Sequence, residues 1–129
     1  MFKLLRCDKG NNPIIKELPA SAGTFEIGEV ATLTAGAITK ATAGTKPQYV
    51  IVEKGTKKAG ETIAVNPIYP DMEFLTTFSA NGSSIVAGNK VTINTDSAQV
   101  TATTSSGVAT VLEKLGDGSV GTEVIVKFE

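Results

Sequence analysis

A chain of 129 residues, 41% of them hydrophobic and 19% charged, is long enough to fold as one domain or as two small units that share a core. Twelve Lys and Arg residues nearly balance thirteen Asp and Glu residues. This balance argues against a nucleic-acid-binding surface and against bulk disorder. There is no His, which excludes Ser-His-Asp and Cys-His catalysis and metal sites built on imidazole. The single Cys7 predicts no intramolecular disulfide, and no apolar run is long enough to predict a membrane span.

Residues 1–24 do not follow the rhythm of alternating strands and turns in the rest of the chain, and we predict that they form an N-terminal arm. Polar, turn-forming residues at 8–13 and small residues at 19–23 separate its apolar side chains. This mixture is typical of a segment that becomes ordered against a partner. An edge strand added to the body of the protein explains the first residues equally well. The predicted partner-binding side chains are the apolar ones of the arm, namely Phe2, Leu4, Leu5, Ile14, Ile15 and Leu18.

Residues 25–129 are predicted to form one β domain. Thr (17 residues), Val (12) and Ile (10) are abundant, and β-branched side chains fit a pleated strand better than a helix. A near-continuous apolar run at 49–53 indicates a strand that is buried on both faces. A polar turn is expected at 54–60. The strands expected in the first half of the domain are 25–33 (with a bulge at Gly28), 38–42, 49–53 and 61–65.

The second half continues this pattern after an extended connection at 66–71, in which Pro67 and Pro70 disfavour helix. No segment shows the period of an amphipathic helix over three turns, and residues 79–84 are the best short helical candidate. We therefore predict an all-β fold, a small antiparallel barrel or sandwich with an aliphatic core. The strands expected in this half are 72–78, 91–93, 108–112 and 124–128.

Two parts of the β domain, residues 28–65 and 88–126, resemble each other. The offset is 60 for the first two pairs of matching segments and 61 for the third, which one inserted turn residue explains. A half this small cannot bury a sheet face alone, so a repeat predicts two four-strand units with the same topology that pack together. Coincidence is the alternative, since segments rich in Thr and Val match easily. The matching segments are Gly28–Leu33 with Gly88–Ile93, Val50–Lys54 with Thr110–Lys114, and Ala59–Val65 with Val120–Val126.

Candidate chemical sites are few. Asp71 and Glu73 lie two residues apart, where a hard cation could bind, but such a pair is more often a solvated strand edge. The segment 53–58 carries three lysines, and an exposed hairpin tip explains them better than a nucleic-acid site. No glycine-rich segment opens a helix, so a phosphate site of that kind is not expected. We therefore predict a protein that is not an enzyme and has no catalytic residue, metal site or cofactor.

Short motifs of the β domain resemble those of bacteriophage head decoration proteins, which are also called capsid cement proteins. The resemblance covers about residues 25–129 and leaves the arm uncovered. It lies in short strands, Ala-Gly turns and a final Val-x-Val-x-Phe strand. The segments that carry it are Gly28–Ala41, Ala59–Val65, Pro70–Phe74 and Gly121–Phe128.

The resemblance implies a non-enzymatic virion protein that binds the outer capsid surface and stabilises the phage head. Its partner would be the major capsid protein, with neither nucleic acid nor a membrane involved. It would be made in the host cytoplasm and act on the capsid exterior as a homo-oligomer, with a trimer as the implied form. We also expect that deletion of residues 1–20 abolishes capsid binding and leaves the fold intact. Tyr69, Met72 and Phe74 are candidates for the oligomer interface, and a core between the two halves is the alternative that their apolar character favours.

The main alternative function is a β-sandwich module that binds carbohydrate or a host-surface protein. Sugar sites usually present exposed aromatic side chains for stacking, and only two Tyr and five Phe are available here. Two or more coplanar aromatic rings in a surface groove would favour this alternative. Further alternatives are a scaffold domain of a bacterial enzyme or transporter, and another phage structural role such as a head fibre or a head–tail joining protein.

Overall fold

The computed structural model describes residues 1–7 and 14–129. All regular structure among these residues is β, so the predicted all-β fold is confirmed. Residues 79–84, the best helical candidate, form bends and turns instead. The strands are β1 (Lys3–Cys7), β2 (Lys16–Pro19), β3 (Gly23–Phe25), β4 (Val30–Thr34), β5 (Ala37–Lys40), β6 (Tyr49–Ile51), β7 (Gly55–Lys57), β8 (Thr62–Pro67), β9 (Met72–Thr77), β10 (Lys90–Val91), β11 (Ala109–Lys114) and β12 (Glu123–Lys127).

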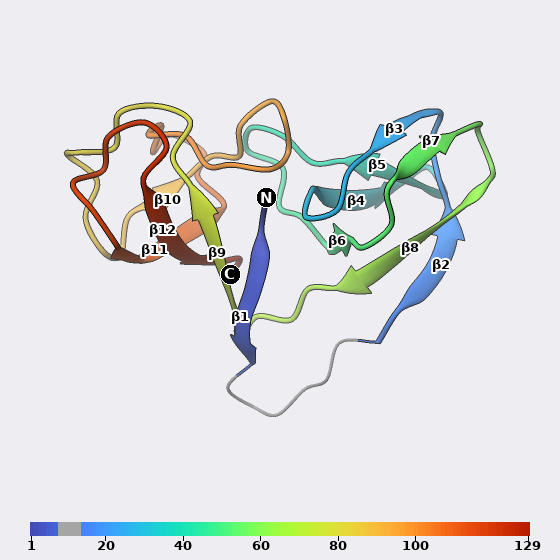
Figure 1. Ribbon diagram of the computed structural model, residues 1–129, viewed down its shortest axis with the longest axis horizontal. Helices are drawn as coiled ribbons and strands as arrows, with labels where there is room; N and C mark the ends of the chain where they lie inside the picture. Colours follow the sequence, from blue (N-terminus) through green and yellow to red (C-terminus); the bar gives the residue numbers. More distant parts are fainter. Residues whose placement is uncertain (8–13) are drawn as a thin grey trace.

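These strands form two five-stranded sheets and one two-stranded sheet. Sheet A has the order β1-β9-β12-β11-β10, sheet B has the order β2-β8-β6-β4-β5, and β3 pairs with β7. Figure 1 shows sheets A and B side by side, with β1 at their junction. Neither sheet closes into a complete ring of strands, so the fold is sandwich-like, one of the two forms expected from the sequence.

The two sheets have the same internal order, because β2-β8-β6-β4 corresponds to β9-β12-β11-β10. We call residues 16–67 the first half and residues 72–127 the second half. The Gly28 amide donates to the Ile51 carbonyl (2.9 Å), and the Gly88 amide donates to the Val111 carbonyl (2.8 Å). The two halves therefore share backbone bonding as well as strand order. Further matching donor and acceptor pairs are Ile51–Glu29 with Val111–Asn89, Ala20–Glu61 with Phe78–Thr122, and Gly60–Ala20 with Gly121–Phe78.

The first strand region expected from the sequence, 25–33, is divided by a turn. Gly28 has a φ of +88°, and its equivalent Gly88 has a φ of +92°. This left-handed conformation favours glycine, and it ends the strand where the sequence predicted a bulge. A Cβ atom at Gly28 would also lie only 2.0 Å from Cγ of Met1. The turn separates β3 from β4 and leaves Ile27 exposed.

Each half encloses its own set of apolar side chains. In each, a parallel bridge (Ala20 with Ile38, or Phe78 with Val100) brings together backbone segments from opposite sides of the half. Six members of each set match in the strand pairing or in the isolated bridges. Phe25 and Ile85 match because each precedes an equivalent turn, in which the Glu26 amide donates to the Glu29 side chain and the Val86 amide donates to the Asn89 side chain. In the first half the set is Ala20, Phe25, Ala31, Ile38, Ile51, Ile63 and Val65, and the equivalents are Phe78, Ile85, Val91, Val100, Val111, Val124 and Val126.

The halves are joined by a shared core. Val30, Ala41 and Val50 of the first half belong to the same buried cluster as the apolar set of the second half. The Val30 amide also donates to the Ser97 carbonyl (2.8 Å). Val50 and its neighbour Ile51 are both buried, which confirms the expected burial of this strand on both faces. The outer face of sheet B, the face turned away from its own apolar set, therefore packs on the second half.

Candidate docking surface

Strands β1 and β2 are edge strands of different sheets, and three of the six predicted partner-binding residues lie in them. The other three lie within two residues before one of these strands. β1 pairs with β9 at the edge of sheet A, and β2 pairs with β8 at the edge of sheet B. The edge-strand alternative, which concerned the first residues of the chain, is therefore observed in β1, while residues 8–13 of the expected arm lie outside the described residues. An edge strand presents backbone groups that can pair with another chain.

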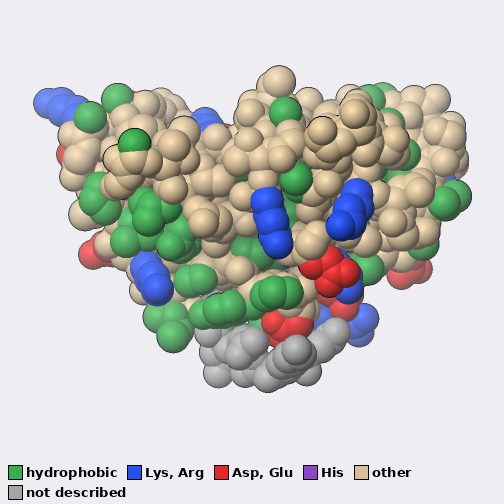
Figure 2. Space-filling model, turned by 180° about the vertical axis from the view of Figure 1, so that it is seen from behind, with side chains coloured by type: hydrophobic (Ala, Val, Ile, Leu, Met, Phe, Trp, Pro, Cys, Tyr) green, Lys and Arg blue, Asp and Glu red, His purple; other side chains and the backbone are tan. Residues whose placement is uncertain are grey.

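Three of the six predicted partner-binding side chains are exposed. Phe2 is 2% exposed and belongs to the shared core, so it is not available to a partner. Leu4 and Leu18 are half-buried against the two apolar clusters. Figure 2 shows hydrophobic side chains gathered over the lower part of one face of the molecule, beside acidic ones. The exposed side chains are Leu5 (44%), Ile14 (61%) and Ile15 (65%), and we call these three the docking surface.

Leu5 lies on the exposed side of β1 together with Lys3, next to an irregularity in the strand. The register with β9 shifts between Leu4 and Arg6, so Leu5 has no partner residue in β9. The shift leaves Arg6 exposed as well, where simple alternation would turn it to the side of Leu4. Beside it, Arg6 Nε lies 3.1 Å from the Glu73 carboxylate, which is largely buried. The apolar Leu5 side chain is thus flanked by an ion pair.

The carboxylates considered for a metal are engaged with other groups. Glu73 pairs with Arg6, and the Asp71 carboxylate lies 3.8 Å from Cys7 Sγ. Within residues 1–7 and 14–129, no group of three or more Asp, Glu or Cys side chains is placed to hold a metal ion. The metal alternative for Asp71 and Glu73 therefore gains no support from their surroundings.

The side chains expected at an oligomer interface belong mostly to the core. Met72 and Phe74 are each 1% exposed, and the Phe74 and Phe128 rings lie 5.6 Å apart. Tyr69 is half-buried against the same cluster. Met72 and Phe74 therefore offer no side-chain surface to a second chain, and the core alternative describes them.

Sequence reasoning missed an apolar face on the outer side of β9, β11 and β12, opposite the buried side that carries Met72 and Phe74. Leu75, Leu112 and Ile125 are half-buried on the outer face of sheet A, and Leu112 and Ile125 line a hollow of about 480 Å³ together with Leu5 and Arg6. Alternation along β9 and β12 was the available signal, since Leu75 follows a buried residue and Ile125 lies between two.

A second hollow, of about 320 Å³, lies between β1 and sheet B. Its lining is mostly apolar, and Lys3 is the only ionisable side chain among the described residues that form it. The Asn66 side-chain oxygen, from another lining residue, is buried without a hydrogen-bond partner. This lining can hold an apolar group, but it brings together no acid–base pair and no nucleophile.

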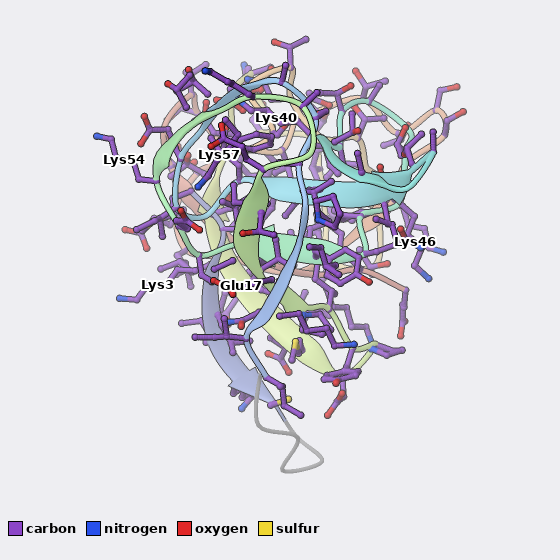
Figure 3. All side chains as sticks on the ribbon, turned by 90° about the vertical axis from the view of Figure 1, so that its right-hand side faces the viewer. Lys3, Glu17, Lys40, Lys46, Lys54 and Lys57 are labelled. Atoms are coloured by element: carbon purple, nitrogen blue, oxygen red, sulfur yellow. The ribbon has the colours of Figure 1, made fainter. Side chains whose placement is uncertain are left out.

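The lysine-rich segment at 53–58 is largely neutralised. Lys57 Nζ lies 2.6 Å from a Glu53 oxygen, and Lys54 Nζ lies 3.7 Å from Glu26. Figure 3 shows Lys54 extending away from the ribbon on the side of sheet B. Part of the segment forms β7 and pairs with β3, where the sequence predicted only a turn. Because β7 pairs with β3 and with no neighbouring strand of the chain, the segment is not the expected hairpin tip, although Lys54 and Lys58 are exposed.

The aromatic side chains lie inside the protein. All five Phe are at most 2% exposed, and Tyr49 and Tyr69 are half-buried against the two clusters. Because every aromatic residue of the chain is among the described ones, no pair of exposed rings is present for sugar stacking.

Comparison of the sequence with protein-family models and with curated proteins finds no match. The part of the chain that the structure describes contains no helix long and apolar enough to cross a membrane.

Proposed function

We propose that this chain is a non-enzymatic phage virion protein that binds the outer capsid surface and stabilises the head. The resemblance to head decoration proteins implies this role. The observation that carries the proposal is the exposure of Leu5, Ile14 and Ile15 on or beside two edge strands. Large apolar side chains held at strand edges are suited to contact with another protein.

The partner in this proposal is the major capsid protein, met on the capsid exterior after synthesis in the host cytoplasm. The role requires no cofactor, nucleic acid or membrane. A homo-oligomer, with a trimer as the implied form, would contact several capsid subunits at once. Weak contacts repeated on one lattice give tight total binding through high effective concentration. A protein that binds only the assembled shell then stabilises it by mass action.

A point substitution tests this proposal better than the deletion of residues 1–20. Phe2 and Ala20 are buried in the two clusters, so the deletion would remove core side chains together with both edge strands. We now expect that deletion to unfold the protein. Ile15 is 65% exposed, so its replacement should leave the core unchanged.

Ile15→Ser should weaken binding to shells assembled from the major capsid protein of the phage. Loss of one buried Ile side chain at each contact corresponds to about 1.5 kcal/mol, or roughly a tenfold weaker affinity. Cosedimentation of the purified chain with the shells measures this. Val120→Ser is the matched control, because Val120 is also 65% exposed, and it should bind as the unsubstituted chain does.

Circular dichroism would confirm that both variants are folded. If the unsubstituted chain fails to cosediment with the shells, the proposed function is wrong. If the chain binds but both variants bind equally well, Ile15 is not part of the docking surface.

A further inference from the structure

In the second half, strand β1 covers the outer edge of β9. Leu75 of β9 pairs with Lys3 of β1 on one side and with Ile125 of β12 on the other. β1 lies outside residues 72–127 and runs antiparallel to β9. The backbone groups on this edge, which would otherwise be left to solvent, are thus paired with a strand from outside the half.

β2 has the position of β9 in the first half, but its outer edge has no strand at Glu17. Glu17 is equivalent to Leu75, because their partners Ala64 and Ile125 match in the repeat. Among the described residues, nothing pairs with Glu17 on the side opposite β8. Figure 1 shows β2 at the border of the molecule, on the side away from sheet A. The first half therefore leaves open the place that β1 fills in the second half.

The backbone amide and carbonyl of Glu17 point toward this open edge. The Ala20 amide donates to the Glu61 carbonyl (2.7 Å), and the Ala20 carbonyl accepts from the Gly60 amide (3.0 Å), so both groups of Ala20 point to the side of β8. Successive residues of an antiparallel strand alternate between its two sides. Glu17, three residues before Ala20, therefore turns both groups away from β8.

Strand β5 closes this edge only where β2 ends. The Ser21 amide donates to the Ile38 carbonyl of β5 (3.0 Å). Pro19 occupies the other outward position of β2, and a residue without an amide is suited to an unpaired edge. β2 thus offers an amide and a carbonyl at Glu17 that have no partner among the described residues.

We infer that an extended segment of the major capsid protein adds to sheet B at the outer edge of β2, antiparallel to it, as β1 adds to sheet A. The inference rests on the proposed function and specifies how the partner is held, namely through main-chain hydrogen bonds to Glu17. The open edge continues directly from exposed Ile14 and Ile15 of the docking surface, so one partner can cover the edge together with these two side chains.

Cross-strand neighbours define the chemistry of this segment. Lys16 and Glu17 are exposed, so an acidic residue opposite Lys16 and a basic residue opposite Glu17 would form favourable pairs. Because the strands are antiparallel, the segment reads basic, acidic and then apolar, with the apolar residue beside exposed Ile15. In the second half, Lys3 of β1 has the place of that basic residue, opposite Leu75.

Glu17→Pro and Glu17→Ala separate main-chain pairing from side-chain contact. Proline removes the outward amide, and Pro19 shows that β2 accepts proline at an outward position. Glu17→Pro should weaken cosedimentation with shells assembled from the major capsid protein roughly thirtyfold, because a capsid carbonyl loses its hydrogen bond. Glu17→Ala keeps the amide, so it should weaken binding only about twofold. Circular dichroism would confirm that both variants are folded.

Hydrogen exchange on the unsubstituted chain gives a second readout that needs no substitution. The Glu17 amide should exchange rapidly in the free chain and slowly in the chain bound to shells. The Leu18 amide, which points to β8, is the internal control and should exchange slowly in both.

A chain that does not cosediment with the shells overturns the proposed function and this inference together. If the chain binds but Glu17→Pro binds equally well, or the Glu17 amide stays unprotected, the inference alone is wrong. Protection of that amide in the concentrated chain without shells overturns the inference too, because a second copy would then be the occupant.

Discussion

Glu53 links the segment of β7 to strand β8. One carboxylate oxygen accepts a hydrogen bond from Lys57 Nζ (2.6 Å), and the other accepts one from the Ala64 amide (2.9 Å). The bond from Lys57, followed by that from Ala64, holds the pKa of Glu53 below its ordinary value of 4.5. The ionised side chain therefore stabilises the folded state.

Glu53→Gln should lower the free energy of unfolding at neutral pH and have less effect in acid. Because the pKa is lower in the folded state than in the unfolded state, the stabilisation is fully present above about pH 4.5 and is lost as the pH falls through the folded value. Urea unfolding at about pH 7 and about pH 3 measures this. Glu17→Gln, on exposed β2, controls for the loss of one negative charge. An effect of Glu53→Gln that is equal at both pH values would contradict the assignment.

At the scale of single residues, the sequence predicted the chemical character of side chains better than their contacts and burial. The polar and charged character of segment 53–58 was evident, but the bond from Ala64 to Glu53 spans 11 residues and depends on how two strands pair. Phe2 and Leu5 are both apolar residues near the start of the chain, yet one is core and the other is exposed. Alternation along the chain puts them on opposite faces, but nothing local in the sequence indicates which of the two faces is the core.

Among the elements, the two apolar sets fill equivalent space with different side chains. The first half has Ala20 and Phe25 where the second half has Phe78 and Ile85. Each half thus has one Phe ring at these two positions, but the ring stands at the second position in the first half and at the first position in the second half. If the two interiors are equivalent, a ring that is removed from one position should be replaceable at the other.

Phe78→Ala should lower the free energy of unfolding by about 3–5 kcal/mol. Ile85→Phe alone should cost about 1–3 kcal/mol, because it overpacks a filled core. The double variant should be more stable than Phe78→Ala alone, since the second substitution reproduces the arrangement of the first half. Guanidinium unfolding of the three variants measures the coupling. Costs that simply add would contradict the equivalence of the two interiors.

Elements with strong alternation were predicted closely, and short polar ones were not. Residues 72–78 and 124–128 were expected as strands, and β9 and β12 occupy nearly the same ranges. The equivalence of the halves was indicated by the nearly constant offset between their matching segments. By contrast, β7 is a polar strand of 3 residues that exists because β3 lies beside it. Its own sequence carries no periodic signal.

For the whole molecule, the position of the N-terminal strand was the least predictable feature. β1 joins the sheet of the second half, although β2 follows it in the chain and joins the sheet of the first half (Figure 1). The reason is Phe2, which packs 5.4 Å from Phe128 in the shared core. β1 has no counterpart in the repeat, so comparison of the halves could not place it.

The shared core also implies that the two halves fold in a fixed order. The apolar set of the first half lies entirely within residues 20–65, whereas the set of the second half shares its cluster with Phe2, Val30 and Val50. The first half can therefore condense on its own, and the second half completes its core only by docking onto it. Pulse-labelled hydrogen exchange during refolding should protect the amides of β6 and β8 before those of β11 and β12. The reverse order would show that the second half is the folding nucleus.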